Sequence, residues 1–370
     1  MKNVVLVTWK GRGNYGTCLQ SYALYRKLQD LGYSVRFLSG IHKKYKFQHF
    51  VKWLTTRIGI KWFYDKVKAQ RMGLKHVKRV EFQHSVFKDV VLCSKHQEEN
   101  LVRQTDCFVT GSDQIWNTYF NFNPTYFLSF AKDKKRVAYA SSIGTNSVRE
   151  EYKEKVKNLL LRFNHIGVRE EDTVQVLSEL TGRDDIRQVV DPTFLLTPSD
   201  WKKMSKNAVL EMKVPNNYIF CYLIGNNEWY KEQLEDVRSK LEIDHIIIIA
   251  SAENPNFSVS DSIVYRDAGP VEYVWLLQHA SFVCTDSFHA TALSINHSIP
   301  FVEFMRFKES DEKSQNQRIH DVLNHYGLQS RVYHKDKAAW ASRIDYKSIQ
   351  GILDKDRMSS LDYLVSSIEK

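Results

Sequence analysis

The stretch that decides the fold is Lys2–Leu38, KNVVLVTWKGRGNYGTCLQSYALYRKLQDLGYSVRFL. It begins with a valine-rich run, Lys2–Thr8, which is typical of a buried strand. A glycine-rich turn follows, and the apolar residues after it recur every three or four positions until Gly32, which predicts a helix that ends there. Ser34–Leu38 is the next apolar run. The order strand, turn, helix, strand predicts the beginning of a parallel α/β sheet.

The same alternation continues to the end of the chain. Apolar runs that predict further strands lie at residues 106–110, 136–141, 165–168 and 188–190, and again at 218–223, 245–250, 263–265, 282–285 and 301–304. Between the two series lies Leu196–Asp200, LTPSD, which is rich in residues that break strands and start helices. We therefore predict two Rossmann-like α/β domains, residues 1–196 and 197–370, which face a cleft where ligands bind.

Length and composition fit this arrangement, because 370 residues suffice for two domains with their own cores. Hydrophobic residues make up 43% and charged residues 26% of the chain, which excludes disordered and fibrous proteins. No apolar run approaches the roughly 20 residues of a membrane span, and the amino terminus lacks the pattern of a secretory signal. The five cysteines are scattered and form no CxxC pair, so we expect neither disulfides nor structural zinc, and a cytoplasmic protein.

The net charge of +10 is carried by residues 43–103, which contain 15 Lys or Arg and 5 Asp or Glu. Because no nucleic-acid binding module is recognisable, we expect an anionic substrate or surface as partner and no nucleic acid. We predict a basic helical insertion here, with Leu54, Ile58, Trp62 and Val67 on one helix face. Such a helix either lies on an anionic membrane surface or packs its apolar face on the first domain, and both remain open.

Four polar segments follow predicted strands and so fall at the carboxyl edges of the sheets. They are Gly11–Gly16, Thr110–Asn117, Gly167–Glu171 and Thr285–Thr291. The first either holds an anion at the start of a helix or forms a tight turn, and it lacks the acidic residue that a dinucleotide site needs. The second either contributes to a site or only caps the next helix.

The other two segments contain the residue types that carry charge and protons in enzymes. Arg169 either pairs with the neighbouring glutamates at the surface or grips a carboxylate or phosphate through its planar fork. His289, at a strand-to-helix junction that faces the cleft, is either structural or a proton-transfer residue. No metal-ligand spacing such as HExxH surrounds it, so we expect no metal.

Together these segments resemble the polysaccharide pyruvyl transferase family. The resemblance covers the chain from about residue 3 to about residue 328, and its parts occur in the family's order. The matching pieces are Asn14–Gly16 with Leu19, Gln20, Ala23 and Leu24; Thr110–Trp116; Ala140–Gly144; Val168–Glu171; Val190–Thr193 with Leu195 and Leu196; Thr285–Thr291 with Ser294; Pro300–Phe301; and Asn316–Ile319.

The resemblance implies a two-domain fold like that of GT-B glycosyltransferases, with the donor site and the catalytic histidine in the second domain. It implies transfer of pyruvate from phosphoenolpyruvate to a hydroxyl pair of a sugar, which gives a pyruvate ketal, with no cofactor besides that donor substrate. His289 matches the family's proton-transfer histidine, and Arg169 its donor-binding arginine. We expect the remaining substrate contacts at Asn14, Tyr15, Gly16, Ser112, Asp113, Gln114, Ser287, Phe288 and Arg318.

Ser287 stands where some members of the family carry an arginine. A second cation for the donor must therefore come from elsewhere, and the candidates are Arg306, Lys308 and Arg318. The acceptor sugar is expected on a nucleotide, polyprenyl or oligosaccharide carrier. The basic insertion fits a lipid-linked acceptor and peripheral contact with the inner membrane face.

Two alternative functions remain. A GT-B nucleotide-sugar glycosyltransferase would share the fold, and Asp286 or Glu303 would then bind a ribose, although neither lies in a recognisable pattern. A binding protein without catalytic activity is favoured only by the departure at Ser287.

Overall fold

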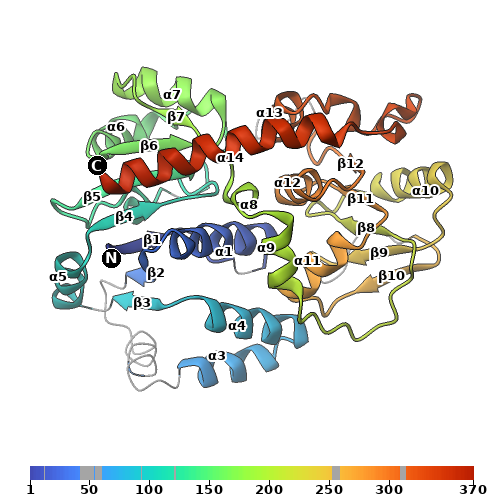
Figure 1. Ribbon diagram of the computed structural model, residues 1–370, viewed down its shortest axis with the longest axis horizontal. Coiled ribbons are helices and arrows are strands. Elements are labelled where there is room, and N and C mark those ends of the chain that lie inside the picture. The colour runs from blue at the N-terminus through green and yellow to red at the C-terminus, as the bar shows by residue number, and fades with distance from the viewer. Residues whose placement is uncertain are drawn as a thin grey trace.

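The computed structural model describes residues 1–11, 13–41, 54, 61–92, 94–120, 122–251, 259–308 and 314–370. It contains two α/β units side by side, each with a parallel sheet covered by helices on both faces (Figure 1). The predicted pair of Rossmann-like units is confirmed.

The first sheet has seven described strands in the order β3-β2-β1-β4-β5-β6-β7, and every neighbouring pair is parallel. The strands are β1 (Asn3–Val7), β2 (Ser34–Ile41), β3 (Asp89–Leu92), β4 (Cys107–Thr110), β5 (Lys135–Ser141), β6 (His165–Val168) and β7 (Arg187–Gln188). The order reverses between β1 and β4, which is where ligands bind in open parallel sheets.

The second sheet repeats the pattern with five described strands in the order β10-β9-β8-β11-β12, again all parallel. The strands are β8 (Ile219–Tyr222), β9 (Ile246–Ile249), β10 (Ser262–Tyr265), β11 (Phe282–Thr285) and β12 (Phe301–Glu303). Four of these strands, all but β10, are buried along their whole length, which explains their continuous apolar sequences.

Helices connect the strands. In the first unit they are α1 (Tyr15–Asp30), α3 (Lys61–Gln70), α4 (Leu74–Val86), α5 (Lys95–Gln104), α6 (Lys153–Leu160) and α7 (Glu171–Thr181). The linker forms α8 (Pro192–Leu195) and α9 (Pro198–Ser205), and the rest are α10 (Tyr230–Leu241), α11 (Pro270–Gln278), α12 (Phe288–His297), α13 (Gln317–His325) and α14 (Tyr346–Glu369). Short 3₁₀ helices are η1 (Pro124–Phe127), η2 (Glu150–Tyr152), η3 (Gln329–Arg331) and η4 (Ala338–Ala341).

The basic insertion is not entirely helical. Asp89–Leu92 forms strand β3 at the edge of the first sheet, beside β2, so the prediction of a helical insertion over residues 43–103 is wrong there. The strand is only four residues long and half of it is partly exposed, which leaves a weak apolar signal. Of the predicted helix face, Ile58 lies outside the described residues, whereas Trp62 and Val67 keep 42% and 37% of their surface exposed. The described part of that face, in which Leu54 is also 38% exposed, is therefore only partly covered by the rest of the protein.

The carboxyl-terminal helix α14 crosses both units (Figure 1). Leu353, near its start, joins the core beneath the second sheet, while Leu364 and Ile368 join the core of the first unit. Lys2 Nζ donates to the carbonyl of Ile368 at 2.9 Å, and Tyr363 donates to the carbonyl of Ala138 at 3.0 Å. The end of the helix thus packs with the first unit, although the predicted boundary assigned all of residues 197–370 to the second.

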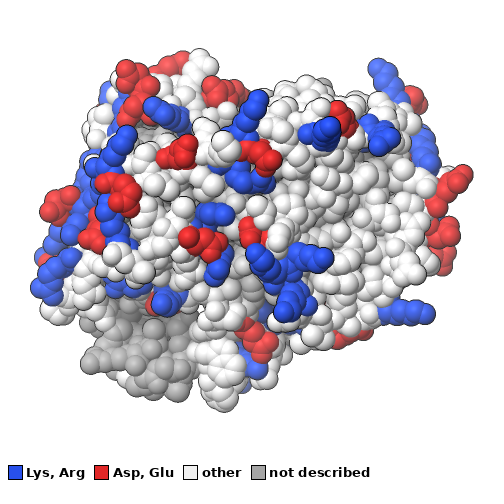
Figure 2. All heavy atoms as spheres, in the orientation of Figure 1, with Lys and Arg blue, Asp and Glu red and all other residues white. Residues whose placement is uncertain are grey.

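Basic and acidic side chains are interspersed on the face of the molecule shown in Figure 2. Among the described helices, none combines the length and the apolar character needed to cross a bilayer. Cys18, Cys107, Cys221 and Cys284 are buried free thiols, and Cys93 lies outside the described residues.

Candidate active site

The loops at the carboxyl ends of the strands of both sheets meet around a cavity of about 210 Å³. The first unit contributes the loops after β1 and β4, and the second unit those after β8, β11 and β12. The lining residues are Trp9, Asn14, Thr17, Asp113, Gln114, Phe120, Ile224, Ser287, Phe288, His289, Arg306, Gln315 and Arg318. The predicted cleft between the units is therefore present and lined mainly by polar side chains.

His289 lies in the first turn of α12 and lines this cavity with only 5% of its surface exposed. Its imidazole is held between Gly16 and Phe288, because a Cβ atom at Gly16 would overlap the ring and the Phe288 ring lies edge-on at 5.3 Å. Its Nε2 atom lies 3.6 Å from Oδ2 of Asp191 and has no hydrogen-bond partner within the described part of the chain. The ring is thus fixed in position and has a carboxylate behind it.

Asp191 is the buried carboxylate of the site, and it is the cap residue at the start of α8. Oδ1 accepts hydrogen bonds from the backbone N–H and the hydroxyl of Thr193, and Oδ2 accepts them from Ser112 Oγ at 3.0 Å and Arg169 Nη1 at 3.2 Å. Burial alone would raise the pKa of Asp191, but the charges of His289 and Arg169 and the hydrogen bonds that Asp191 accepts from Arg169 and Thr193 bring it well below its usual range. An ionised Asp191 stabilises a protonated imidazole and fixes its orientation.

Arg169 follows β6 and has a side chain that is only 2% exposed. Nε donates to Glu170 at 2.7 Å, Nη1 donates to Asp191 and lies 4.0 Å from Asp113 Oδ1, and the guanidinium stacks on the Phe288 ring at 4.4 Å. Burial alone would lower the pKa of Arg169, but these three carboxylates raise it. The ion pair with a neighbouring glutamate that the sequence allows is present with Glu170, but it is buried and not at the surface. Nη2 alone is buried without a hydrogen-bond partner among the described residues.

The loop after β4 supports this network from the first unit. Asp113 adopts a left-handed backbone conformation (φ 74°) and accepts a hydrogen bond from Thr17 Oγ1 at 2.7 Å. The amide of Gln114 donates to Gln315 Oε1 at 3.0 Å, and this contact joins the two units across the cavity. The Thr110–Asn117 segment therefore forms one wall of the cavity.

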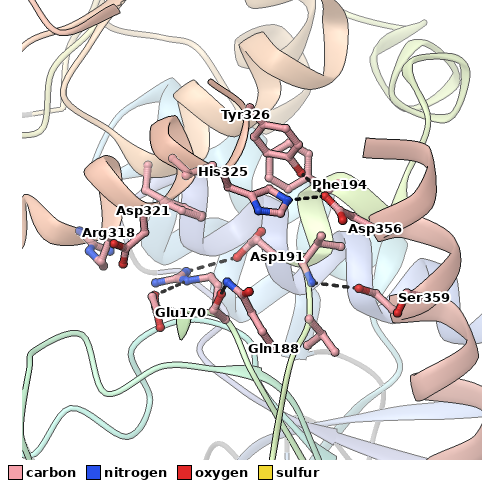
Figure 3. Close-up of a pocket in the computed structure, with 16 residues that line it drawn as sticks. Glu170, Gln188, Asp191, Phe194, Arg318, Asp321, His325, Tyr326, Asp356 and Ser359 are labelled. Carbon is pink, nitrogen blue, oxygen red and sulfur yellow. Dashed lines mark hydrogen bonds and ion pairs between the residues drawn. The ribbon is translucent and has the colours of Figure 1, made fainter. Parts of the chain in front are cut away.

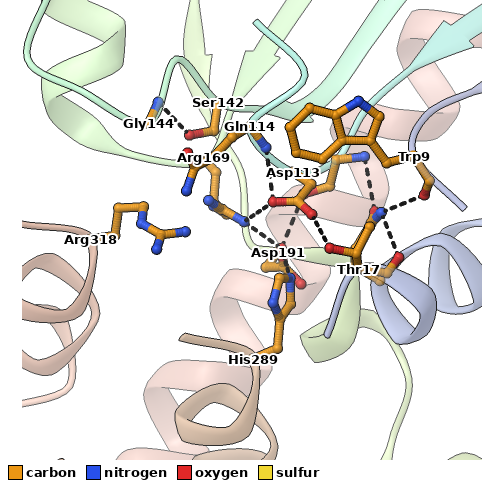
Figure 4. A network of polar contacts seen from close by, with 12 residues as sticks. Trp9, Thr17, Asp113, Gln114, Ser142, Gly144, Arg169, Asp191, His289 and Arg318 are labelled. Carbon is orange, nitrogen blue, oxygen red and sulfur yellow. Dashed lines mark hydrogen bonds and ion pairs between the residues drawn. The ribbon is translucent and has the colours of Figure 1, made fainter. Parts of the chain in front are cut away.

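Two arginines of the second unit supply the cations of the cavity. Arg306 donates from Nε to Asp286 Oδ2 at 3.1 Å and from Nη2 to the carbonyl of Asp286. Arg318 lies beside the network without joining it (Figure 4), and its hydrogen bonds to described residues go to the carbonyl and the side-chain oxygen of Gln315, at 3.4 and 3.3 Å. It forms no ion pair within the described ranges, and burial, with the charges of Arg169 and Arg306, lowers its pKa to about 10. Of the three candidate cations, Lys308 lines a different groove.

The amino-terminal end of α12 also points to an anion site. Ser287 precedes the helix, and its Oγ is buried without a hydrogen-bond partner among the described residues, although it lines the cavity. The helix has ten residues, so its first turn carries unpaired N–H groups and a partial positive charge. A carboxylate or phosphate at this end would satisfy both features.

Most of the predicted site residues line the cavity, namely Asn14, Asp113, Gln114, Ser287, Phe288, His289 and Arg318. Gly16, Ser112 and Arg169 lie one layer behind and hold His289 or Asp191. Tyr15 lies elsewhere: its ring stacks on Tyr273 at 4.5 Å and its hydroxyl donates to the carbonyl of Ala268 at 2.6 Å, so it joins the two units.

Asp191, Thr17 and Trp9 also belong to the site, although no local sequence pattern indicates a role for them. The Asp191-Pro192-Thr193 segment was noticed only as part of the family pattern, because an aspartate before a helix is explained locally as a cap. A signal for its role was its place after a predicted strand, at the edge that carries the other polar segments.

The acidic residues of the alternative function are occupied by the protein. Asp286 accepts hydrogen bonds from the backbone of Ile224 and Gly225, from Tyr230 and from Arg306. Glu303 is fully buried beside Thr291, and burial raises its pKa. Neither carboxylate lines the cavity, so neither can accept a hydrogen bond from a ribose bound there.

Known structures with the same arrangement support the fold. UDP-GlcNAc 2-epimerase from Neisseria meningitidis bound to UDP-GlcNAc is 12% identical, with a TM-score of 0.51, over 99% of this chain and 100% of that chain. The S. aureus MnaA–UDP structure is 9% identical, with a TM-score of 0.50, over 96% and 89% of the two chains. These likenesses establish a GT-B-like fold.

Sequence comparison identifies the family. No curated protein matches the chain. A model of the family described as polysaccharide pyruvyl transferase, however, matches residues 14–305, which extend from the start of α1 to the end of β12 and include the network around Asp191 and His289. The chain belongs to the polysaccharide pyruvyl transferase family.

Proposed function

We propose that this protein transfers pyruvate from phosphoenolpyruvate to two hydroxyls of a sugar in a glycan precursor and forms a cyclic ketal. The observation that carries the proposal is the pair His289–Asp191 at the edge of a cavity whose other side presents Arg318 and Arg306. A proton-transfer group and a set of cations in one cavity suit a substrate that is an anion and is activated by protonation.

The donor carries a carboxylate and a phosphate, and the cavity offers groups for both. Arg318 has no carboxylate partner among the described residues, so an anionic ligand would satisfy it. Ser287 Oγ and the first-turn N–H groups of α12 supply neutral donors beside it. Arg306, which Asp286 holds in place, adds a second cation. We propose that these groups bind the donor without a metal or another cofactor.

The reaction then follows from the chemistry of an enol phosphate. His289, protonated, gives its proton to the methylene carbon, and the carbon that bears the phosphate becomes an oxocarbenium-like centre. One acceptor hydroxyl attacks that centre and returns a proton to the imidazole. The carbon–oxygen bond to phosphate breaks, and the second hydroxyl attacks to close the ketal while its proton leaves with phosphate. Asp191 stabilises the imidazolium.

The test is release of phosphate from phosphoenolpyruvate in the presence of a sugar acceptor, together with the methyl signal of a pyruvate ketal in the NMR spectrum of the product. We expect His289→Ala to abolish both while circular dichroism and the melting temperature stay close to those of the wild type. Activity near the wild-type level in His289→Ala would overturn the role of this residue. Hydrolysis of a nucleotide sugar would favour a glycosyltransferase, and binding of phosphoenolpyruvate without turnover would favour a protein that only binds.

We also propose that the acceptor is carried by a nucleotide, a polyprenyl chain or an oligosaccharide, and that a cytoplasmic enzyme meets a lipid carrier at the inner membrane face. Helix α3 supports this part, since Trp62 and Phe63 are 42% and 62% exposed and Lys66 lies 4.9 Å from the Trp62 ring. We expect the protein to float with anionic vesicles at low salt, and the double variant Trp62→Ala, Phe63→Ala to float less. Equal flotation of the wild type and the double variant would contradict the membrane contact. So would a wild-type protein that does not float with the vesicles.

A further inference from the structure

A second cavity, of about 110 Å³, has Asp191 and Arg169 among its lining residues. Figure 3 shows Asp191 with the residues that surround this cavity. It is enclosed by the loops after β6 and β7, by α8 and by facing sides of α13 and α14. Phe194 and Phe288 form its inner wall, and Asp356 and Ser359 lie on α14 where that helix is more exposed. Of the residues on α13 and α14 that line this second cavity, only Arg318 takes part in the proposed pyruvyl transfer.

The cavity adjoins the donor cavity. Phe288 and Arg318 line both, and Asp191, in the wall of the second cavity, lies 3.6 Å from His289 in the first. A ligand in the second cavity would therefore lie against the same arginine and the same aromatic ring as the donor. This is the position that a second substrate requires.

The charges of this second cavity nearly cancel. Glu170 is paired with Arg169 at 2.7 Å, and Asp356 with His325 at 2.6 Å. Asp321 accepts a hydrogen bond from Gln317 at 2.7 Å and forms no ion pair among the described residues, and burial raises its pKa to about 6. An anion would lie against these carboxylates and a cation against the arginines, so the balance favours a neutral ligand.

The unsatisfied groups also match a ligand that both donates and accepts hydrogen bonds. Asp321 has free capacity to accept, while Nη2 of Arg169 is buried without a partner in the described residues and can only donate. Phe194, Phe288 and Tyr326 provide aromatic surface beside them. Vicinal hydroxyls on a ring with apolar C–H faces have this combination of properties.

We propose that this second cavity binds the sugar ring of the acceptor, with Asp321 and Arg169 Nη2 as its hydrogen-bond partners. The proposal rests on the proposed pyruvyl transfer, because it places the two substrates in adjoining cavities that share Arg318 and Phe288. Asp321 is the residue in this cavity that distinguishes a hydroxylated ligand from an anion.

The test blocks the cavity at its more exposed end and leaves the donor cavity unchanged. Ser359→Trp places a large side chain on α14 at the cavity. The matched control is Met358→Trp, because Met358 is the preceding residue, is 65% exposed and does not line the cavity. The probes are methyl β-galactoside, methyl α-mannoside and methyl N-acetyl-β-glucosaminide, followed by saturation-transfer NMR without phosphoenolpyruvate. We expect at least one glycoside to bind the wild type and Met358→Trp, and its signal to disappear in Ser359→Trp.

Asp321→Asn tests the polar contact without adding bulk. We expect the dissociation constant of the bound glycoside to rise about tenfold, as the loss of one hydrogen bond to a charged group predicts, and the affinity for phosphoenolpyruvate to change less than twofold. Asp362→Asn, an exposed position on α14, is the control.

Three results would overturn the proposal: no glycoside binds the wild type, Ser359→Trp binds as the wild type does, or phosphoenolpyruvate displaces the glycoside. Each differs from failure of the proposed function, which would appear as absent phosphate release or an absent ketal in the presence of a bound sugar.

Discussion

Gly16 lies directly against the imidazole of His289, so that a Cβ atom at Gly16 would overlap the ring. The two residues come from different units: Gly16 is the second residue of α1, and His289 is the second residue of α12. The first turns of two helices thus approach each other closely, and the missing side chain of Gly16 makes room for the imidazole. Its backbone is not in the left-handed region, so the close approach is what requires glycine.

Gly16→Ala should therefore lower activity without unfolding the protein. The imidazole must shift to make room for the Cβ atom, and displacement of a catalytic group by about 1 Å costs roughly 100-fold in kcat. Alanine has a higher helix propensity than glycine by up to about 1 kcal/mol, which offsets the local repulsion. The measurement is kcat together with thermal unfolding. Gly13→Ala is the control, because a Cβ atom there meets nothing within 4 Å. Equal kcat values for the two variants would contradict the contact.

Asp191→Asn should remove the charge that stabilises the imidazolium while it keeps the shape of the side chain. We expect kcat to fall by roughly 10²–10⁴ and the free energy of unfolding by about 3 kcal/mol, since Arg169 loses a buried partner. The folded pKa of Asp191 is lowered, so its contribution is present above the unfolded pKa of about 3.9 and is lost as the pH falls through the folded value.

The stability difference between wild type and Asp191→Asn should therefore stay constant from pH 8 to pH 5, as measured by urea unfolding. Asp184→Asn, an exposed position in the same unit, should match the wild type in both activity and stability. A difference that is already lost at pH 5 would mean that Asp191 is not held ionised by its partners.

The strands were predictable from the sequence because most of them are buried on both faces and so form continuous apolar runs. Val4–Val7 in β1 and Ile246–Ile249 in β9 are buried without exception. Strand β3 was not predictable, because Asp89–Leu92 is a short edge strand within a basic region. Helix α14 shows another limit, because no sequence pattern indicates that its last turns pack with the first unit.

The site was predictable as a set of segments but not as a set of contacts. Polar residues after strands had to gather at one edge, and His289, Ser287 and Asp113 do so. The sequence does not reveal which side chains face the cavity, so Tyr15 was placed with the substrate although it packs between the units. The pairing of Asp191 with His289 depends on how the two units meet, and no local pattern encodes it.

Arg318→Gln should weaken binding of the donor more than it affects the fold. Arg318 has no ion pair among the described residues, and its removal leaves no carboxylate without a partner. We expect KM for phosphoenolpyruvate to rise at least about tenfold, with a change in the free energy of unfolding of less than about 1 kcal/mol. Arg306→Gln should instead destabilise the protein, because Asp286 would lose its cation.

Arg343→Gln, an exposed arginine of the second unit, is the control for both arginine variants. The measurements are initial rates over a range of phosphoenolpyruvate concentrations and urea unfolding of each variant. An unchanged KM in Arg318→Gln would mean that the anionic groups of the donor lie elsewhere.

Helices α13 and α14 are tied by an ion pair that titrates in an accessible range of pH. His325 Nε2 lies 2.6 Å from Asp356 Oδ2, and this hydrogen bond raises the pKa of His325. A raised folded pKa means that the contribution to stability is fully present below the unfolded pKa of about 6.5 and is lost as the pH rises through the folded value. His325→Gln should therefore lower the free energy of unfolding by up to about 1 kcal/mol at pH 5.5 and by almost nothing at pH 9. Urea unfolding at both pH values measures this, with the exposed His334→Gln as control.

Because the pair of His325 and Asp356 is partly exposed, 0.5 M salt should reduce the difference in unfolding free energy at pH 5.5. A difference that is the same at both pH values would show that the charge of His325 contributes nothing to stability.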